Sequence, residues 1–173
     1  MILFMERTLI VLKPDAVQRG IVGEIVTRFE RAGLKIVGAK MVRPDDAHYF
    51  THYEKIGKLA TRRGQKTFDI TVEMMKMGPV IAMVLEGIEA AELVRKMVGP
   101  TEPKSAPPGT IRGDYSHISY TYADSEEVGI PNLIHASGDA KEAKEEIAHW
   151  FSEHELHDYA TSHEHFTQAR KKK

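Results

Sequence analysis

The chain has 173 residues, of which 42% are hydrophobic and 28% are charged, with a formal net charge of -1. These values are typical of a single soluble globular domain with one core. The near-neutral charge argues against a general nucleic-acid-binding surface. The sequence contains no cysteine, which excludes disulfides, a thiolate nucleophile and cysteine-ligated metals.

The two ends of the sequence differ from the rest. Residues 1–5 are apolar, but they are too few to span a membrane, and they lack the basic start and cleavage site of a signal peptide. We therefore expect a cytoplasmic protein without a membrane partner. Residues 1–153 are expected to form the domain, and residues 154–173 a polar tail rich in histidine and lysine. The tail histidines lack the rigid arrangement of a structural metal site; they are His154, His157, His163 and His165.

Hydrophobic periodicity predicts the elements in chain order. The predicted strands and helices alternate over residues 8–12, 21–32, 34–41, 44–55, 68–77, 80–85, 89–98, 132–137 and 139–152. Residues 57–66 are predicted as a cationic loop and residues 101–131 as a long irregular stretch, which in a compact domain is usually functional or disordered. The continuously apolar strand 80–85 is expected at the centre of the sheet. The alternation indicates an α/β sandwich.

One histidine interrupts the last predicted strand. An imidazole at His135, where valine or isoleucine is usual, is either a satisfied core histidine or a reactive group, and the strand alone favours the first. Glu146 falls at the edge of the buried stripe of the final helix, so it either reaches water or turns inward. An inward carboxylate would fix the tautomer and angle of the His135 ring.

Strand alternation makes a further prediction about this segment. It places Leu133, His135 and Ser137 on one face, so that Ser137 could hydrogen-bond with the same groups. Asn132 falls on the opposite face, and reaches the same ligand only if it precedes the regular strand.

Three cations are candidates for binding an anion. Lys13 ends an apolar strand, where it is either a solvated lysine or a ligand-binding group. Arg95 lies near the C-terminus of a predicted helix, and alone it is better explained by the helix dipole. Arg112 lies in a glycine-bracketed loop, where its guanidinium can bind phosphate or form a loop ion pair with Asp114.

The common glycine-rich nucleotide motifs are absent from the sequence. It has no P-loop, no dinucleotide fingerprint and no protein-kinase motif set. Any phosphate would therefore be bound by side-chain cations.

Together these motifs resemble the nucleoside diphosphate kinase family. The resemblance covers most of residues 6–151. The matching stretches are residues 6–20, 78–87, 108–114 and 132–137. The combination of the three motifs that contain Lys13, Arg112 and His135 is far more specific than any one of them.

The resemblance implies a fold and an activity. The fold is a ferredoxin-like α/β (α+β) sandwich on a four-stranded antiparallel sheet. The activity is ping-pong transfer of the γ-phosphate of a nucleoside triphosphate such as ATP to a nucleoside diphosphate. Mg2+ would be held mainly by the nucleotide phosphates, with no protein metal site. The family also implies a homo-oligomer, a hexamer or a tetramer.

By position in the family motifs, individual residues acquire expected roles. His135 resembles the phosphohistidine nucleophile, Glu146 and Ser137 the pair that orients it, and Tyr53 an active-site tyrosine. The residues that resemble those holding phosphates and ribose are Lys13, Arg95, Thr101, Arg112 and Asn132.

The sequence departs from the family where the base should stack. The family usually has two adjacent phenylalanines, and here the pair is Thr67 and Phe68, so the stacking ring is either lost or moved to Phe68. The segment from Tyr115 to Pro131 is also longer than in common members. A non-catalytic scaffold is therefore one alternative function, supported only by Thr67. A nucleic-acid-binding sandwich is another, disfavoured by charge and by the absence of aromatic interleaving.

Overall fold

The computed structural model describes residues 4–167. Four strands form one sheet in the order β2-β3-β1-β4, with every neighbouring pair antiparallel. The strands are β1 (Met5–Leu12), β2 (Lys35–Val42), β3 (Val80–Ile88) and β4 (Ile134–Ala136). The predicted four-stranded antiparallel sheet is confirmed, and so is the central position of the apolar strand, β3.

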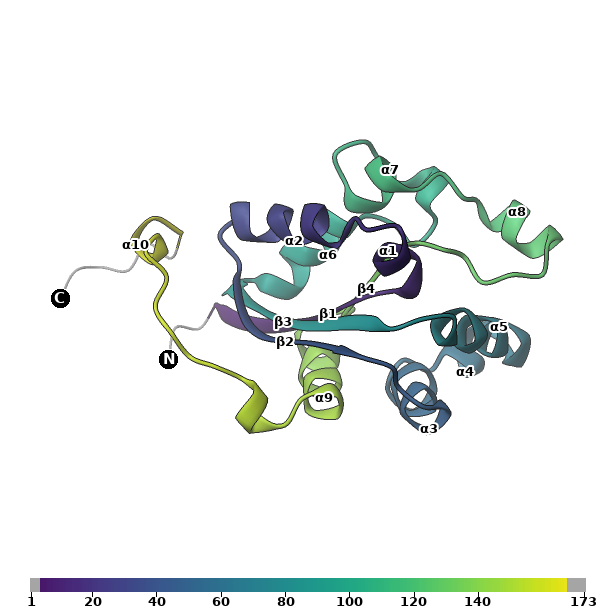
Figure 1. Ribbon diagram of the computed structural model, residues 1–173, viewed down its shortest axis with the longest axis horizontal. Coiled ribbons are helices and arrows are strands. Elements are labelled where there is room, and N and C mark those ends of the chain that lie inside the picture. The colour runs from purple at the N-terminus through teal and green to yellow at the C-terminus, as the bar shows by residue number, and fades with distance from the viewer. Residues whose placement is uncertain (1–3, 168–173) are drawn as a thin grey trace.

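Helices cover both faces of the sheet (Figure 1). Alternation along β1 divides the core, because Ile10 and Leu12 pack under α2 (Val22–Arg31) and α6 (Ala90–Val98). Leu9 and Val11 point to the opposite layer. The helices of that layer are α3 (Asp46–Phe50), α5 (Gln65–Lys76) and α9 (Ala140–Trp150).

Two segments predicted as loops contain short helices. The stretch 57–66 contains α4 (Leu59–Arg63), and the stretch 101–131 contains a 3-10 helix (Pro103–Ser105), α7 (Ile111–Tyr115) and α8 (Tyr120–Ser125). The loop predictions are therefore wrong in part. Side-chain caps start two of these helices, since Thr110 accepts from the Gly113 N–H at 3.1 Å and Ser119 from the Tyr122 N–H at 3.2 Å.

The remaining helices mark the ends of longer elements. The helix predicted over residues 44–55 is α3 followed directly by a π-helix (Thr51–Ile56). α1 (Pro14–Gln18) follows β1, and the C-terminal part has a 3-10 helix (Glu153–Glu155) and α10 (Glu164–Thr167). No helix in residues 4–167 is long and apolar enough to cross a membrane.

The described part of the C-terminal tail runs along the edge strand β2. The His157 N–H donates to the Val37 carbonyl oxygen and the Tyr159 hydroxyl to that of Ile36, both at 2.7 Å. A bulge in β2 occurs at this point, between Ile36 and Gly38. A Cβ at Gly38 would lie 2.9 Å from Leu156 Cδ2, so the glycine allows the tail to approach. The end of the predicted tail, residues 168–173, lies outside the described residues.

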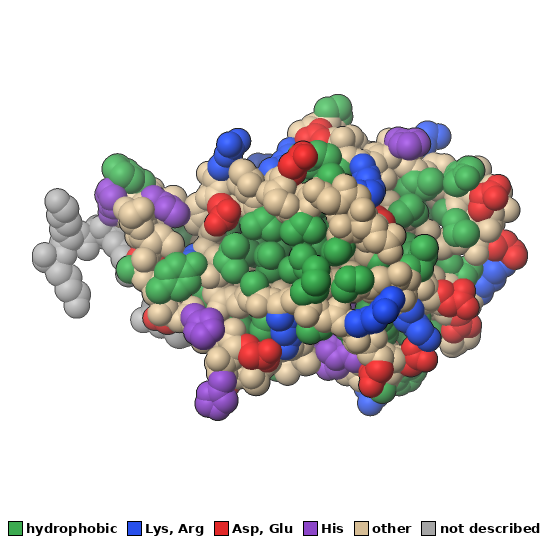
Figure 2. Space-filling view, in the orientation of Figure 1, with side chains coloured by type: hydrophobic (Ala, Val, Ile, Leu, Met, Phe, Trp, Pro, Cys, Tyr) green, Lys and Arg blue, Asp and Glu red, His purple; other side chains and the backbone are tan. Residues whose placement is uncertain are grey.

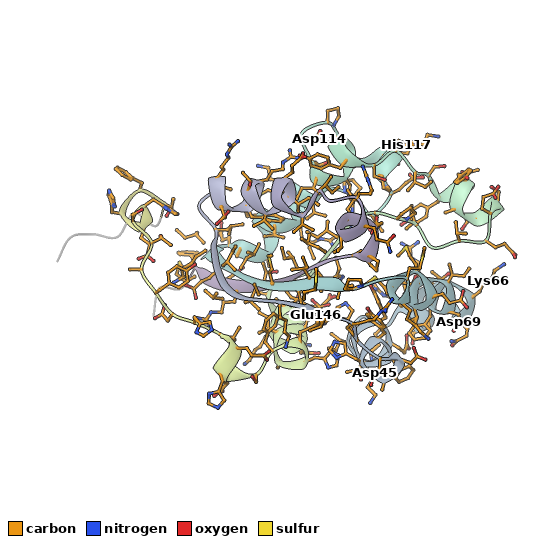
Figure 3. All side chains as sticks on the ribbon, viewed as in Figure 1. Asp45, Lys66, Asp69, Asp114, His117 and Glu146 are labelled. Carbon is orange, nitrogen blue, oxygen red and sulfur yellow. The ribbon has the colours of Figure 1, made fainter. Side chains whose placement is uncertain are left out.

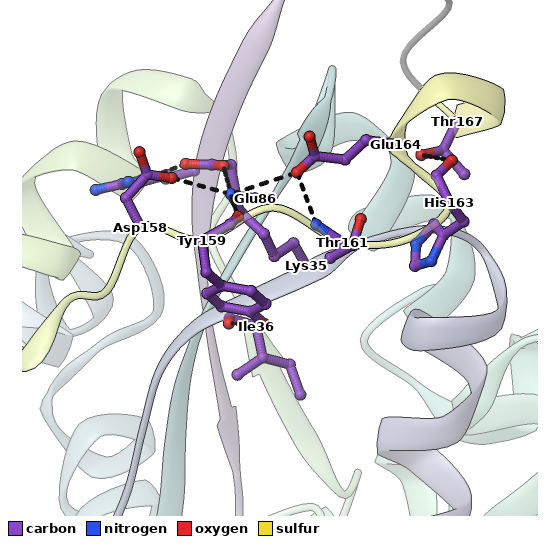
Figure 4. A network of polar contacts seen from close by, with 10 residues as sticks. Lys35, Ile36, Glu86, Asp158, Tyr159, Thr161, His163, Glu164 and Thr167 are labelled. Atoms are coloured by element: carbon purple, nitrogen blue, oxygen red, sulfur yellow. Dashed lines mark hydrogen bonds and ion pairs between the residues drawn. The ribbon is translucent and has the colours of Figure 1, made fainter.

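A buried lysine joins this tail to the sheet (Figure 4). Lys35 is 6% exposed, and its Nζ lies 2.8 Å from a Glu86 carboxylate oxygen and 3.2 Å from one of Asp158. It also donates to the Tyr159 carbonyl oxygen at 2.8 Å. On the face shown in Figure 2, hydrophobic side chains gather over the middle and charged ones lie around them.

Candidate active site

The structure brings His135 and Glu146 together from two elements. His135 lies on β4 with 18% of its side chain exposed, and its Nε2 is 2.8 Å from Glu146 Oε1. Glu146 points from α9 toward the sheet and is buried (Figure 3). Of the two orientations left open by the sequence, the inward one is therefore observed. The His135 ring is in the core layer but keeps access to solvent.

Hydrogen bonds fix the other oxygen of Glu146. The Ser137 hydroxyl donates to Glu146 Oε2 at 2.6 Å and accepts from the Leu9 N–H at 3.2 Å. Burial raises the pKa of Glu146, but its interactions with His135 and the Ser137 hydrogen bond outweigh burial and lower this pKa to about 2. Because an ionised carboxylate lies beside Nε2, a neutral His135 ring is most stable with its proton on that nitrogen, which leaves the free lone pair on Nδ1.

The backbone before β4 departs from an ideal strand. Leu133 has a φ of +72°, a left-handed conformation that is unfavourable for a leucine. Its N–H donates to an Asp15 carboxylate oxygen at 3.0 Å, and its carbonyl oxygen accepts from the Lys13 N–H at 2.8 Å. Leu133 consequently packs with Ile134 in the core layer under α2 and α6, and the prediction that it shares a face with His135 is wrong. The alternation of side chains between strand faces does not extend to Leu133, because its left-handed backbone conformation lies just before β4.

The same left-handed conformation places Asn132 outside β4, as the sequence required for it to join the site. Lys13 Nζ donates to Asn132 Oδ1 at 2.7 Å, and Asn132 Nδ2 donates to the Thr101 carbonyl oxygen at 2.9 Å. Lys13 is only 6% exposed. Its burial, together with the nearby charge of Arg112, lowers its pKa to about 8, while Asp15 acts in the opposite direction.

Arg112 is held entirely by backbone. Its donors bind the carbonyl oxygens of Gly99 at 2.9 Å, Asn132 at 3.1 Å and Ile134 at 2.6 Å. The alternative ion pair with Asp114 is wrong, since that carboxylate lies 2.7 Å from Arg28 instead. Burial and the charge of Arg95 lower the pKa of Arg112 to about 10. Within residues 4–167 the hydrogen bonds of this guanidinium go to backbone carbonyls and none goes to a carboxylate, so its positive charge could act on an external anion.

The other predicted site residues are either exposed at the edge of the site or buried in the core. Arg95 and Thr101 are exposed at the rim, and Arg95 is close enough for its charge to act on Arg112. Tyr53 is buried on the π-helix, and its hydroxyl has no hydrogen-bond partner within residues 4–167. Burial raises the pKa of Tyr53, so its hydroxyl stays protonated and can donate to a ligand.

Sequence reasoning missed two residues that contact the site. Asp15 fixes the Leu133 backbone, and His52 is buried beside His135 with 4.5 Å between ring centroids. A signal for His52 was present, because the dipeptide His-Tyr occurs twice, at residues 48–49 and 52–53. The two pairs are one helical turn apart, and the second supplies Tyr53 as well.

The ring expected to stack on a base is not in the site. Phe68 is 9% exposed and packs in the core layer that contains Tyr53, with its ring 6.0 Å from that of Phe50. Thr67, which precedes it, is exposed. Of the two alternatives, loss of the stacking ring therefore agrees with the structure, and its transfer to Phe68 does not.

Three possible metal ligands lie together within the described residues. One nitrogen each from His52 and His135 and one oxygen of Glu146 are within 4.8 Å of one another. Two imidazoles and one carboxylate suit a transition metal better than Mg2+, which prefers oxygen ligands. These side chains therefore do not form a protein cage for Mg2+.

Comparison with known proteins places this geometry in a family. The nucleoside diphosphate kinase family profile matches residues 6–156. A nucleoside diphosphate kinase of Borreliella burgdorferi is 41% identical over 157 residues, covering 91% of this chain and 93% of the relative. One of Pyrococcus horikoshii is 46% identical over 154 residues, covering 89% and 90%.

A solved structure agrees over almost the whole chain. It is a transition-state mimic of the nucleoside-diphosphate kinase from Borrelia burgdorferi with bound vanadate and ADP, and it superposes with a TM-score of 0.92 at 39% identity. The match covers 95% of this chain and 98% of that one. By sequence and by fold, the chain belongs to the nucleoside diphosphate kinase family of phosphotransferases.

Proposed function

We propose that this chain transfers the γ-phosphoryl group between nucleotides through a phosphohistidine at His135 Nδ1. The observation that carries the proposal is the contact of Nε2 with the ionised Glu146, which leaves Nδ1 as the nucleophilic nitrogen on a partly exposed ring. A covalent intermediate divides the transfer into two in-line steps with ping-pong kinetics.

In the first step the Nδ1 lone pair attacks the γ-phosphorus. The P–N bond forms as the bond to the β,γ-bridging oxygen breaks, and the nucleoside diphosphate leaves with those electrons. A second nucleoside diphosphate then attacks the phosphohistidine through its terminal phosphate oxygen and restores the ring. Lys13 and Arg112 would offset the charge on the transferred group, since most catalysis of phosphoryl transfer is positioning and electrostatics. Arg95, Thr101 and Asn132 would hold the remaining phosphates and the ribose.

Mg2+ fits this proposal as a group held by the substrate. The Glu146 oxygens already contact Ser137 and His135, so this carboxylate is not free to bind it. When bound with the nucleotide, Mg2+ would withdraw charge from its phosphates. We further propose a cytoplasmic homo-oligomer, hexameric or tetrameric, that discriminates little between bases because the proposed contacts address phosphate and sugar.

Labelling tests the proposal directly. The protein mixed with γ-labelled ATP and Mg2+ should take up an acid-labile, base-stable label, and added GDP should remove it. His135→Ala should abolish the label, and His154→Ala, at an exposed histidine, should retain it. Undiminished labelling of His135→Ala would mean that another residue is the nucleophile. Nucleotide binding without any label in the unmodified protein would favour the scaffold alternative.

A further inference from the structure

A second imidazole lies behind the proposed nucleophile and has no role in the transfer so far. His52 is 2% exposed, and its ring meets that of His135 at 80°. Its Nδ1 is 3.5 Å from Glu146 Oε1, the same oxygen that contacts His135. Two histidines therefore face one carboxylate oxygen, and either could in principle donate to it.

Trp150, the only tryptophan of the chain, decides between them. Its indole N–H donates to His52 Nδ1 at 3.1 Å, and the two rings lie nearly perpendicular at 5.4 Å. A ring nitrogen that accepts a hydrogen bond carries no proton, and indole can only donate. The proton of a neutral His52 is consequently on Nε2, and Nδ1 has none to offer Glu146.

We propose that Trp150 and His52 are positioning residues, in which the indole N–H holds His52 as the Nε2–H tautomer and so reserves Glu146 Oε1 for His135. This inference rests on the proposed role of His135 as the phosphoryl acceptor. In this arrangement His52 is a neutral residue that packs against His135. It does not compete with His135 for the Glu146 carboxylate.

The charges around His52 agree with this neutral state. Burial lowers the pKa of His52 well below its ordinary value, and nearby histidines lower it further, whereas Glu146 raises it. The titratable groups that face His52 come from β4, from α9, from α3 and from its own π-helix. They are His135, Glu146, His149, His48 and Tyr53. Without the indole donor, Glu146 is the group that would favour a proton on Nδ1.

Trp150→Phe tests this arrangement because it removes the donor and keeps an aromatic ring. His52 can then shift its proton from Nε2 to Nδ1 and donate to Glu146 Oε1 in competition with His135. We expect kcat to fall about tenfold with KM nearly unchanged, the effect of losing one charge-assisted hydrogen bond. Because the shift moves a proton within one neutral ring, the size of the fall should not depend on pH.

The double variant Trp150→Phe/His52→Phe separates competition from simple loss of packing. A phenylalanine at residue 52 cannot donate to Glu146, so kcat should recover toward the unmodified value. A double variant whose kcat is as low as that of the single variant would overturn the inference. So would a Trp150→Phe enzyme whose kcat is unchanged.

Nitrogen-15 NMR of the unmodified protein gives a readout that does not depend on a variant folding. The inference predicts that His52 Nε2 carries the proton and that Nδ1 shows the shift of an unprotonated nitrogen. A proton on Nδ1 would overturn it. Failure of this inference can be distinguished from failure of the proposed function. The label at His135 is measured on the same preparation, and it is absent only if the proposed function is wrong.

Discussion

At the scale of single residues, burial gives the two central cations different chemistry. Lys13 has its pKa lowered to about 8, and Arg112 to about 10. The lysine can therefore lose its charge within an ordinary assay range, whereas the arginine stays charged. Burial lowers both pKa values, and Arg112 stays charged because the ordinary pKa of arginine, 12.5, is higher than that of lysine, 10.5.

Lys13 should consequently set the alkaline limit of the free enzyme. We expect kcat/KM to decline as the pH rises through about 8, because Lys13 becomes neutral before nucleotide binds. The limb in kcat should lie at higher pH, since bound phosphate favours the charged amine. Lys13→Arg should remove the limb near pH 8 while lowering overall activity. A kcat/KM profile that stays flat up to pH 10 would contradict this assignment.

The lowered pKa of Lys13 also makes the stability of the fold depend on pH. This dependence has the opposite sign from that of a lysine in an ion pair. The unfolded chain binds the proton more tightly, since the ordinary lysine pKa is 10.5 and the folded value is about 8. The free protein should therefore gain stability as the pH rises from about 8 toward 10.5. Lys13→Met should weaken that rise in chemical unfolding experiments. An identical pH dependence in the variant would argue against the burial effect.

At the scale of elements, α9 carries Glu146 on its buried stripe and begins at a side-chain cap, Asp139. The Asp139 carboxylate accepts from the Glu142 N–H at 2.8 Å. The distance in sequence from this cap to Glu146 is nearly two turns, so the cap holds the helix without touching the site.

Asp139→Ala should lower the unfolding free energy by about 1 kcal/mol, the usual cost of losing such a cap. The melting temperature should fall by about 2–4 °C for a domain of this size, with kcat nearly unchanged. Lys144→Ala, at an exposed position of the same helix, serves as the control. A large loss of kcat at an unchanged melting temperature would show that Asp139 acts on the substrate instead.

The elements also show which parts of the secondary structure can be predicted from the sequence. Long periodic runs predicted the strands and the main helices, because burial of one face determines them. The helices α7 and α8 are short, and each depends on a single cap, Thr110 or Ser119. Periodicity therefore predicts an irregular segment in their place. The left-handed Leu133 could not be predicted, because the Asp15 carboxylate that supports it is 118 residues away.

The residues of the site were predicted mainly from sequence motifs. The apolar pattern alone favoured a core histidine at His135, and only the joint resemblance of the segments with Lys13 and Arg112 indicated phosphate chemistry. Spacing left the direction of Glu146 open, because a residue at the edge of a helix stripe can point either way. The repeated His-Tyr dipeptide marks His52, but its contact with Trp150 joins two helices that are far apart in the sequence, and local patterns do not show such a contact.

At the scale of the whole molecule, Lys35 joins the C-terminal tail to the sheet. Burial lowers the pKa of Lys35, but its bonds to Glu86 and Asp158 outweigh burial and raise it. The lysine therefore stays charged at every pH at which the protein is assayed. Because it lies far along β2 from the site, its contribution should be to stability rather than to catalysis.

Lys35→Met should destabilise the fold by about 1–3 kcal/mol, since the largely buried Glu86 loses a charged donor. The loss is limited because Glu86 retains Arg7 at 2.8 Å. Denaturant unfolding measures it, and kcat at low temperature should not change. Asp158→Ala is the matched control, because Asp158 is 87% exposed and a surface pair contributes about 0–1 kcal/mol. Equal losses in the two variants would place the stabilisation in the tail contact alone.

The tail also affects how one molecule meets another during storage or overexpression. An open strand edge is a template on which further chains can add and grow into insoluble ribbons. By occupying the carbonyls of Ile36 and Val37, the tail blocks this growth at the start of β2, and the opposite border, β4, is only three residues long. Shortening the chain after Ser152 should therefore appear first as turbidity on concentration, before any loss of turnover.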